Sequence, residues 1–269
     1  MMATIVLPSI DLPLFQDITI VNREEEEDFR LMGEISRRRH IPFLQGRWTL
    51  EVFDKPVEQG GILIHRHSER AHSAVRNYYN WLFSQGAGKD ANTAVFGAGS
   101  VNIKTTAGVT DVGAFPIGLG HNASRDTNAA WVSVESAATT GLRGPTADAT
   151  QGIVVGSGLG AYSFEDFKLG TQILNGTGGG QLSHVLGEVP VLSYDAGTKT
   201  LTTTHARFFN NNSGGPIDVN ELSLYCLAND ASVVLAKFAV ERTVLGATVT
   251  IPNTGQLKVT YVISLVYPA

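Results

Sequence analysis

Three histidines lie close together in the chain at a spacing that suits a metal ion. His65 and His67 are two residues apart, so on a strand their side chains face the same side, and His72 follows in what we expect to be a helix. Glu69 is near, but no carboxylate has a clear claim to complete the coordination shell. A polar, basic junction between a strand and a helix explains the cluster better, so we predict no metal ligands and leave metal binding at these histidines open.

A glycine-rich turn follows an apolar stretch in the second half of the chain. Residues 153–155 read IVV and residues 156–160 read GSGLG, which superficially fits a dinucleotide-binding turn. Such a turn opens a sustained helix, and an acidic residue follows about 20 residues later. Here YSFEDFKLG and then further glycines follow instead, which indicates a tight loop between strands and no nucleotide cofactor.

Residues that serve in acid–base or nucleophilic catalysis are present, but not in a catalytic arrangement. Glu165 and Asp166 are adjacent, and adjacent carboxylates on a turn rarely have the roughly 5–10 Å separation that glycoside hydrolysis requires. The chain contains no GxSxG motif, and its seven histidines have no evident orienting acid. The single cysteine, Cys226, excludes an intramolecular disulfide framework and is typical of a packed strand residue. We therefore predict no catalytic residues, no cofactor and no enzymatic activity.

Composition and charge indicate a folded protein without a general attraction to polyanions. The 269 residues are 43% hydrophobic and 17% charged, with a net charge of −5, which gives no electrostatic reason to bind nucleic acid or acidic membranes. No apolar run approaches the roughly 20 residues that cross a bilayer. The first residues lack a basic segment and contain Pro8 and Pro13, so we expect no signal peptide and a chain kept in a reducing cytosol until it assembles.

The composition changes near residue 90. Residues 1–90 contain 11 of the 20 Lys and Arg and 13 of the 25 Asp and Glu, but only 6 of the 29 glycines. This change predicts an extended arm over residues 1–22, an α+β docking region over 23–90 and a β-sandwich body over 91–269. Prolines favour the extended arm, in which Ile18 and Ile20 suit a strand.

Two helices and one strand are expected in the docking region. Acids at residues 24–28 and bases at 37–39 match the dipole of a helix that ends before Pro42, with Phe29, Met32 and Ile35 or Ser36 on its inner face. Residues 43–53 alternate as a strand does. Residues 68–84 predict a second helix, because apolar residues recur there at helical spacing: Ala71, Val75, Tyr78, Tyr79 and Leu82.

From residue 92 onward the pattern is that of strands and turns. Short strands are expected at 101–105, 130–136 and 151–155, and a hairpin at 192–204 with its turn at 195–197. An asparagine-rich turn at 210–215 leads into a strand at 217–227, where a change of apolar parity near Asn220 and Glu221 predicts a β-bulge. A long final strand covers 258–266. The predicted fold is mainly β, with an antiparallel β-sandwich or jelly roll in the C-terminal part.

Three stretches of the C-terminal half also resemble known sequences. Residues 152–184, GIVVGSGLGAYSFEDFKLGTQILNGTGGGQLSH, and the later runs RFFNNNSGGPIDVNELSLYCLA and VTIPNTGQLKVTYVISLVYPA resemble uncharacterised virion structural proteins of tailed bacteriophages. The resemblance covers roughly the last 120 residues and extends less distinctively to the first 90. It implies a non-enzymatic virion component made in the host cytoplasm, such as a head decoration, neck, collar or tail-associated protein. No functional residues come with it.

The resulting hypothesis is a protein that self-associates and binds neighbouring virion proteins, with no membrane or nucleic-acid partner. Aromatic residues and arginine dominate interface energetics. The interface residues predicted on that basis are Phe15, Arg38, Arg39, Trp48, Tyr78, Tyr79 and Trp81. Core packing in the N-terminal region is an equal explanation for Trp48 and Trp81. The alternative function is a carbohydrate- or receptor-binding module of a phage fibre or tail, with Tyr162, Phe164 and Phe167 as glycan-contacting candidates.

Overall fold

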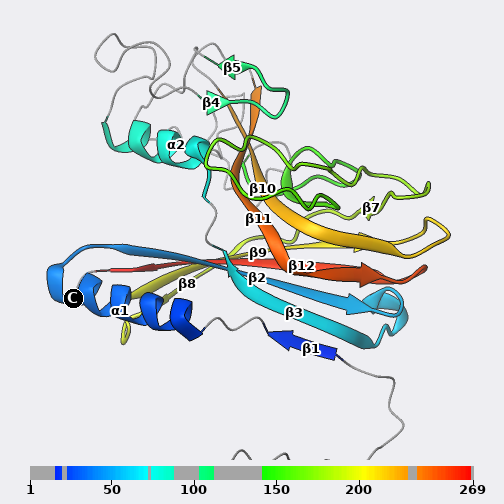
Figure 1. The fold of residues 1–269 in the computed structure, drawn as a ribbon, viewed down its shortest axis with the longest axis horizontal. Coiled ribbons are helices and arrows are strands. Elements are labelled where there is room, and N and C mark those ends of the chain that lie inside the picture. The colour runs from blue at the N-terminus through cyan, green and yellow to red at the C-terminus, as the bar shows by residue number, and fades with distance from the viewer. Residues whose placement is uncertain are drawn as a thin grey trace, which may run out of the picture.

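Strands are the main regular structure of the protein and pair almost entirely antiparallel, which confirms the predicted mainly β fold. A computed structural model describes residues 16–19, 23–71, 74–87, 103–111, 141–229 and 235–267. In these ranges a seven-stranded sheet and a three-stranded sheet face each other, and the two helices lie on opposite sides of the larger sheet (Figure 1). The elements are β1 (Gln16–Thr19), α1 (Arg23–Arg39), β2 (Phe43–Phe53), η1 (Val57–Gln59), β3 (Leu63–Ala71), α2 (Arg76–Ala87), β4 (Ile103–Lys104), β5 (Thr110–Asp111), β6 (Gly152–Gly156), β7 (Ser183–His184), β8 (Val191–Asp195), β9 (Thr200–Asn210), β10 (Ile217–Asn229), β11 (Leu235–Ile251) and β12 (Gln256–Val266).

The larger sheet joins strands from the two ends of the chain. Its order is β1-β3-β2-β12-β9-β7, and β8 also pairs with β9. Strand β12 is antiparallel to both of its neighbours along its whole length, from Gln256 opposite Phe53 to Val266 opposite Phe43 on the β2 side. Residues on the two sides of the predicted boundary at 90/91 therefore contribute strands to one sheet.

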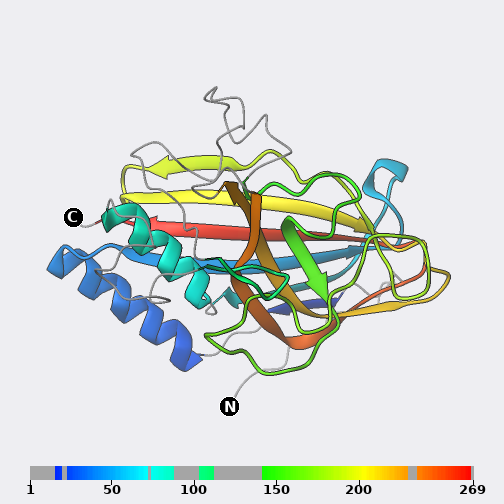
Figure 2. The ribbon, with the colours of Figure 1, turned by 90° about the horizontal axis from the view of Figure 1, so that it is seen from above.

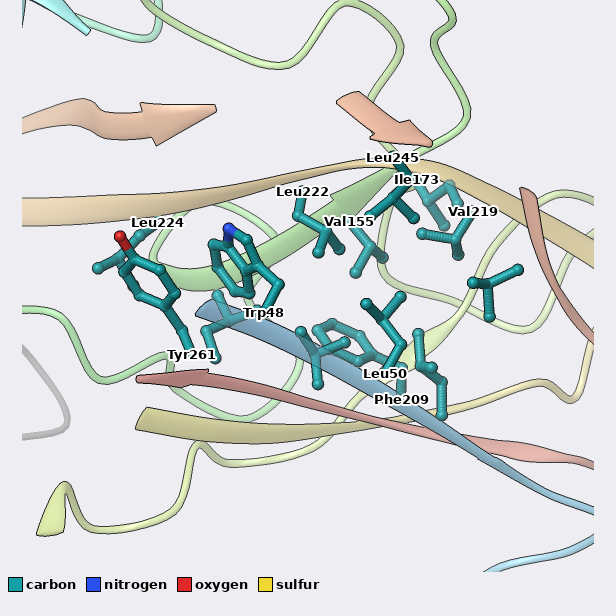
Figure 3. Packing of buried hydrophobic residues seen from close by; sticks show 14 of the residues in the cluster. Trp48, Leu50, Val155, Ile173, Phe209, Val219, Leu222, Leu224, Leu245 and Tyr261 are labelled. Atoms are coloured by element: carbon teal, nitrogen blue, oxygen red, sulfur yellow. The ribbon is translucent and has the colours of Figure 1, made fainter. Parts of the chain in front are cut away.

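The smaller sheet, in the order β11-β10-β6, covers one face of the larger sheet. Figure 2 shows β10 and β11 crossing over the long strands beneath them. Between the sheets, Trp48 and Leu50 of β2 point toward Leu222 of β10 and Val155 of β6 (Figure 3). All four of these side chains are fully buried, as is Cys226, so the interior is a sandwich core built from alternate residues of both sheets.

Helix α1 has the predicted extent, but its inner face differs from the prediction. Phe29 contacts Phe43 with ring centroids 5.8 Å apart, and Gly33 and Ser36 are the buried helix residues. Met32 and Ile35 are exposed, at 40% and 37%. The helix lies on the sheet face opposite the core, where Phe29 and the ion pairs of Glu26 with Arg47 and Arg70 attach it to the sheet.

The start of the second helix was predicted wrongly. Residues 68–71 belong to β3, which pairs with β2 from Leu63 opposite Phe53 to Ala71 opposite Gly46, and α2 begins only at Arg76. The helical spacing of apolar residues in this region spans a strand end, a bridge and a helix start. Cross-strand pairing to β2 decides the conformation of the first part, because it buries alternate residues of β3.

Most of the turns and strands in the second half of the chain lie where the sequence predicts them. The β8–β9 hairpin turns after Asp195, and the register of β10 against β11 shifts between Val219 and Glu221, which confirms the predicted bulge. Strands β4 and β6 lie in two of the predicted short stretches. In the N-terminal arm, residues 16–19 form β1, parallel to β3. The rest of the arm and the predicted strand at 130–136 lie outside the described residues. Neither of the two helices in the described part of the chain is long and apolar enough to cross a membrane.

Candidate interaction surface

The two adjacent acids at 165 and 166 are held in separate ion pairs. Arg76 of α2 donates to Glu165, with Nε 2.8 Å from Oε2, at an exposed site. Arg242 of β11 donates from Nη1 to Oδ2 of Asp166 at 2.7 Å, and only 3% of the Arg242 side chain is exposed. The pairs face different elements, so the two carboxylates serve to attach the loop to α2 and to β11.

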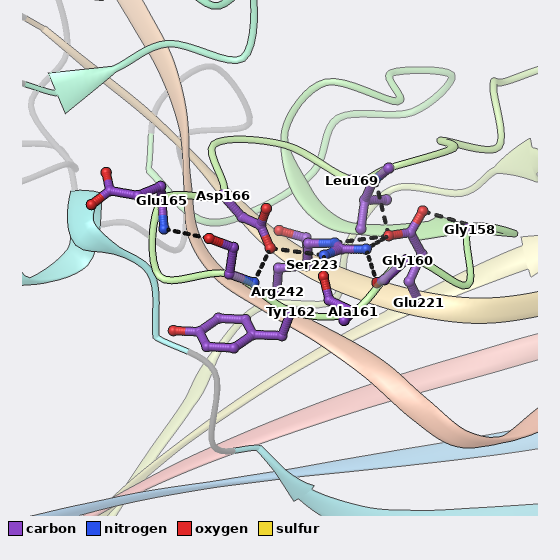
Figure 4. A network of polar contacts seen from close by, with 12 residues as sticks. Gly158, Gly160, Ala161, Tyr162, Glu165, Asp166, Leu169, Glu221, Ser223 and Arg242 are labelled. Carbon is purple, nitrogen blue, oxygen red and sulfur yellow. Dashed lines mark hydrogen bonds and ion pairs between the residues drawn. The ribbon is translucent and has the colours of Figure 1, made fainter.

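A buried carboxylate occupies the glycine-rich turn (Figure 4). Glu221 of β10 is fully buried. Its carboxylate accepts hydrogen bonds from the backbone N–H groups of Gly158, Gly170 and Thr171, at 3.1, 3.0 and 2.7 Å. It also accepts from Nε of Arg242 at 2.9 Å. Gly158 belongs to the turn and Gly170 and Thr171 to the returning part of the loop, so the carboxylate joins the two sides of the loop. A Cβ at Gly158 would lie 2.9 Å from Cδ of Glu221, so the turn needs glycine there.

A second buried arginine fixes the segment that precedes β6. Arg207 of β9 is 1% exposed, and burial lowers the pKa of its guanidinium to about 10. Its donors satisfy five backbone carbonyls at 2.6–3.0 Å, which are those of Pro145, Asp148, Gln151, Ile153 and Val185. A cavity of about 10 Å³ beside it is lined by Ile153, His205 and Gly187, among others, and has room for about one water molecule. Arg207 therefore has the role of a cross-link between loop and sheet.

The histidine cluster splits between the strand and undescribed residues. His67 is fully buried on β3, and its Nε2 lies 2.8 Å from Oε2 of Glu69, which also accepts the N–H of Gly246 at 3.0 Å. His65 lies two residues earlier on β3, and His72 is outside the described residues. No group of three metal-ligating side chains converges within the part of the chain that the structure describes.

Another acid, Glu241 of β11, is buried near Glu69 of β3. Glu241 is 3% exposed, and burial raises the pKa of its carboxyl to about 8, with the charge of Glu69 adding to the effect. A hydrogen bond from the Thr243 hydroxyl and the charge of Arg242 act in the opposite direction. The carboxyl is therefore neutral at pH 7, and the site is a buried polar junction between the two sheets.

The structure separates the predicted interface residues. Trp48 is fully buried and stacks on Tyr261 with centroids 4.1 Å apart, so its prediction as an interface residue is wrong and the core explanation holds. Tyr78 and Trp81 of α2 pack partly buried against the same core, whereas Tyr79 is 51% exposed. Arg38 and Arg39 are exposed on α1, on the other side of the larger sheet (Figure 1). Phe15 lies outside the described residues.

The three aromatic candidates for glycan binding contact neighbouring elements. The Tyr162 hydroxyl donates to the carbonyl of Ala74 at 2.9 Å, and the ring of Phe164 lies 5.8 Å from that of Tyr79. Nζ of Lys104 lies 4.0 Å from the centroid of Phe167. Tyr162 and Phe164 remain 38% and 42% exposed, so they present ring edges and faces on one loop.

An apolar surface at one end of the larger sheet was not predicted. Four residues lie directly opposite one another across four strands: Leu44 on β2, Leu265 on β12, Leu201 on β9 and Tyr194 on β8. Leu44 and Tyr194 are 41% and 54% exposed, and the two leucines between them are partly exposed. In a sheet with strands about 4.8 Å apart, this row is roughly 14 Å long.

A second row lies one step closer to the core. Ile263 of β12 is opposite Thr203 of β9, which is opposite Leu192 of β8, and Leu192 is 66% exposed. Alternate residues of a strand lie on one face of the sheet, and on β2 this face includes both Leu44 and the buried Trp48. Both rows therefore lie on the same face as the core, beyond the part of it that the smaller sheet covers. We call Leu44, Leu192, Tyr194, Leu201, Ile263 and Leu265 the sheet-end surface.

The sheet-end surface arises because the two sheets cross at an angle (Figure 2). Strands β10 and β11 of the covering sheet have 13 and 17 residues, but they run across the 11-residue strands β2, β9 and β12 and so cover only part of their length. Figure 2 shows the long strands continuing on both sides of the crossing. The alternation of apolar residues in these strands is visible in the sequence, but the point at which the cover ends depends on how the sheets cross.

Comparison of the chain with protein-family models, curated proteins and solved structures found no match in any of the three.

Proposed function

We propose that the protein is a non-enzymatic structural component of a large assembly, in which it self-associates and binds neighbouring proteins. The observation that carries the proposal is the sheet-end surface. The resemblance of the C-terminal stretches to tailed-phage virion proteins supports placement in a virion, as a head decoration, neck, collar or tail-associated protein.

The sheet-end surface has two properties of a contact site. It is a contiguous apolar area on the continuation of a core face, and exposed areas of this kind mark sites of protein association. It also ends at β8, whose five residues are all exposed and which pairs with β9 on one side. No described strand pairs with the other side of β8. An open strand edge offers unpaired N–H and C=O groups, so a neighbour that pairs with β8 satisfies the backbone and covers the apolar rows together.

The size of the effect can be judged from one residue. Full burial of a leucine side chain contributes about 1.5–3 kcal/mol. Leu192 is two-thirds exposed in the single chain, so covering it contributes about 1–2 kcal/mol to association. Placing a charge there removes this contribution and adds the cost of desolvating an ammonium group.

The test is the mass of the protein in solution by light scattering over a range of concentrations. We expect the wild-type protein to exceed the 28.8 kDa of one chain, and Leu192→Lys to weaken association at least about 10-fold. Leu174→Lys is the matched control, because Leu174 is 57% exposed and lies outside the sheet-end surface. A wild-type protein that stays at the mass of one chain at every concentration would contradict the proposal, as would equal effects of the two variants.

The exposed pair of rings on α2 and the 160–170 loop favours carbohydrate binding as a second candidate function. Tyr79 and Phe164 are 51% and 42% exposed with centroids 5.8 Å apart, and Arg76 lies 5.1 Å over the Phe164 ring. Exposed aromatic faces beside a charged group provide stacking and polar contacts for a sugar ring. Binding to a glycan array that Tyr79→Ala abolishes would favour this function, and no binding to any glycan would contradict it.

A further inference from the structure

The outward face of α1 carries an exposed stripe whose chemistry changes from acidic to basic along the helix. Asp28, Leu31, Ile35 and Arg38 are spaced by three, four and three residues, which places them on one side of a helix. Leu31 and Ile35 are 47% and 37% exposed, and the two charged residues are exposed as well. We call these four residues the α1 stripe.

Contacts on the opposite side of α1 hold the stripe away from the sheet. Arg70 of β3 donates from Nε to Oε1 of Glu26 at 2.7 Å, and Arg47 of β2 donates to the same oxygen at 3.0 Å. The Arg70 guanidinium also lies 4.1 Å from the centroid of Phe29. The helix is therefore fixed in rotation, and Figure 1 shows it beside the face of the larger sheet that the smaller sheet does not cover.

The two charges of the stripe are available to a partner. Among the described residues, neither Asp28 nor Arg38 forms an ion pair or hydrogen bond through its side chain. The neighbouring charges on the flank of α1 are already engaged, because Arg30 bonds to both Glu27 and Glu34. The stripe thus has an apolar centre between an exposed acid and an exposed base, neither of which is paired with another described residue.

We infer that the partner of the α1 stripe is the same stripe of a second copy of this chain, packed antiparallel across a two-fold axis. This inference rests on the proposed self-association and adds a second contact to it. In this arrangement Leu31 lies opposite the partner's Ile35, and Asp28 lies opposite the partner's Arg38. Each contact occurs twice, as two-fold symmetry requires. Parallel packing would instead place like charges opposite each other.

The stripe is short, so the contact contributes in combination with the sheet-end surface. From Asp28 to Arg38 the helix rises about 15 Å, or roughly three turns. Exposed ion pairs are individually weak, and they weaken further in salt. Two different contacts on one chain reinforce each other, because formation of the first raises the effective concentration for the second.

The experiment separates the two contacts by using Leu192→Lys as the background. In this background the sheet-end contact is weakened, and we expect light scattering to give twice the mass of one chain at high concentration. Adding Arg38→Glu, or adding Asp28→Arg, converts two attractive pairs into two repulsive ones and weakens the dimer about 30-fold. Adding both changes together restores it, because the reversed charges again face each other.

A mixture of the two single reversals gives the sharpest result. The Asp28→Arg chain and the Arg38→Glu chain each repel their own kind, but both pairs between the two different chains are attractive. The inference therefore expects a 1:1 heterodimer in the mixture and monomers in the separate samples. Arg37→Glu is the control, because Arg37 is exposed on the same turn but lies outside the stripe. Far-ultraviolet circular dichroism checks that each variant is folded.

Each of the other outcomes overturns the inference. The first is a Leu192→Lys protein that remains monomeric at every concentration, and the second is a mixture of the two reversals that stays monomeric. The third is an Arg37→Glu variant whose dimer is weakened as much as that of Arg38→Glu. If the wild-type protein still self-associates through the sheet-end surface in these cases, the proposed function stands and only the α1 contact fails. If the mass never exceeds one chain in any variant or in the wild-type protein, both fail.

Discussion

Replacing Glu241 by glutamine is expected to change how the stability of the protein depends on pH. The folded state raises the pKa of this carboxyl from its ordinary 4.5 to about 8, because the side chain is buried and lies near the charge of Glu69. Glutamine has nearly the same shape, retains an oxygen that accepts from Thr243, and cannot ionise.

The sign follows from which state binds more protons. Between pH 4.5 and 8 the unfolded chain has lost the proton of Glu241 while the folded protein keeps it, so the free energy of unfolding falls as the pH rises. Each pKa unit corresponds to 1.36 kcal/mol, and the difference between 4.5 and about 8 sets a ceiling of about 5 kcal/mol. Relaxation around a buried charge reduces this value, and we expect a loss of about 2–5 kcal/mol.

Urea denaturation at several pH values between 4.5 and 9 measures this effect directly. We expect Glu241→Gln and the wild-type protein to have similar free energies of unfolding at pH 4.5, and the variant to be more stable by about 2–5 kcal/mol at pH 8.5. Other titrating groups are common to both proteins and cancel in the difference. Glu58→Gln, at an exposed position, is the control and is expected to show no such trend. A difference that stays constant with pH would refute the reasoning.

Two further predictions test other parts of the interior. Gly158→Ala is expected to lower the free energy of unfolding by about 2–4 kcal/mol. The added Cβ would displace the Glu221 carboxylate from the backbone N–H groups that donate hydrogen bonds to it. Gly160→Ala, with no atom within 4 Å of its Cβ, should change the same quantity by less than about 1 kcal/mol, and equal losses would count against the network. Burial lowers the pKa of His205 to about 4, so the unfolded chain takes up its proton first and stability is lost as the pH falls from 6.5 toward 4. Between pH 6.5 and 4, we expect the free energy of unfolding of His205→Gln, measured by urea denaturation, to fall by up to about 3 kcal/mol less than that of the wild-type protein. Equal decreases in the two proteins would contradict this account.

Local features of the fold were predictable because their causes lie within a few residues. The acids and bases at the two ends of α1 and the alternation of β2 gave the correct extents of these elements. The change of parity near Asn220 located the bulge of β10, because a bulge shifts the register by one residue.

Features that depend on distant partners were not predictable in this way. Residues 68–71 have helical spacing, yet they form a strand because β2 lies beside them. The sequence shows that Trp48 is a large aromatic, but only the smaller sheet decides that it is covered. The sheet-end surface was missed for the same reason, since its exposure is set by where that cover ends. Of the predicted interface residues, Arg38 and Arg39 on α1 and Tyr79 on α2 are exposed in the structure.

The position of β12 between β2 and β9 affects how the chain folds during synthesis. Strand β12 lies between β2 and β9 and pairs with both, so these two strands become part of one sheet only when β12 is in place. The ribosome produces β12 after every other described strand. The pairing of β2 with β12 closes a loop of about 200 residues, and contacts of such long sequence separation slow folding. The central sheet is therefore completed late, and until then the rows of Leu44 and Leu201 are not joined by Leu265. A nascent chain consequently lacks the continuous sheet-end surface, so association through it is delayed until folding of the same chain is nearly complete.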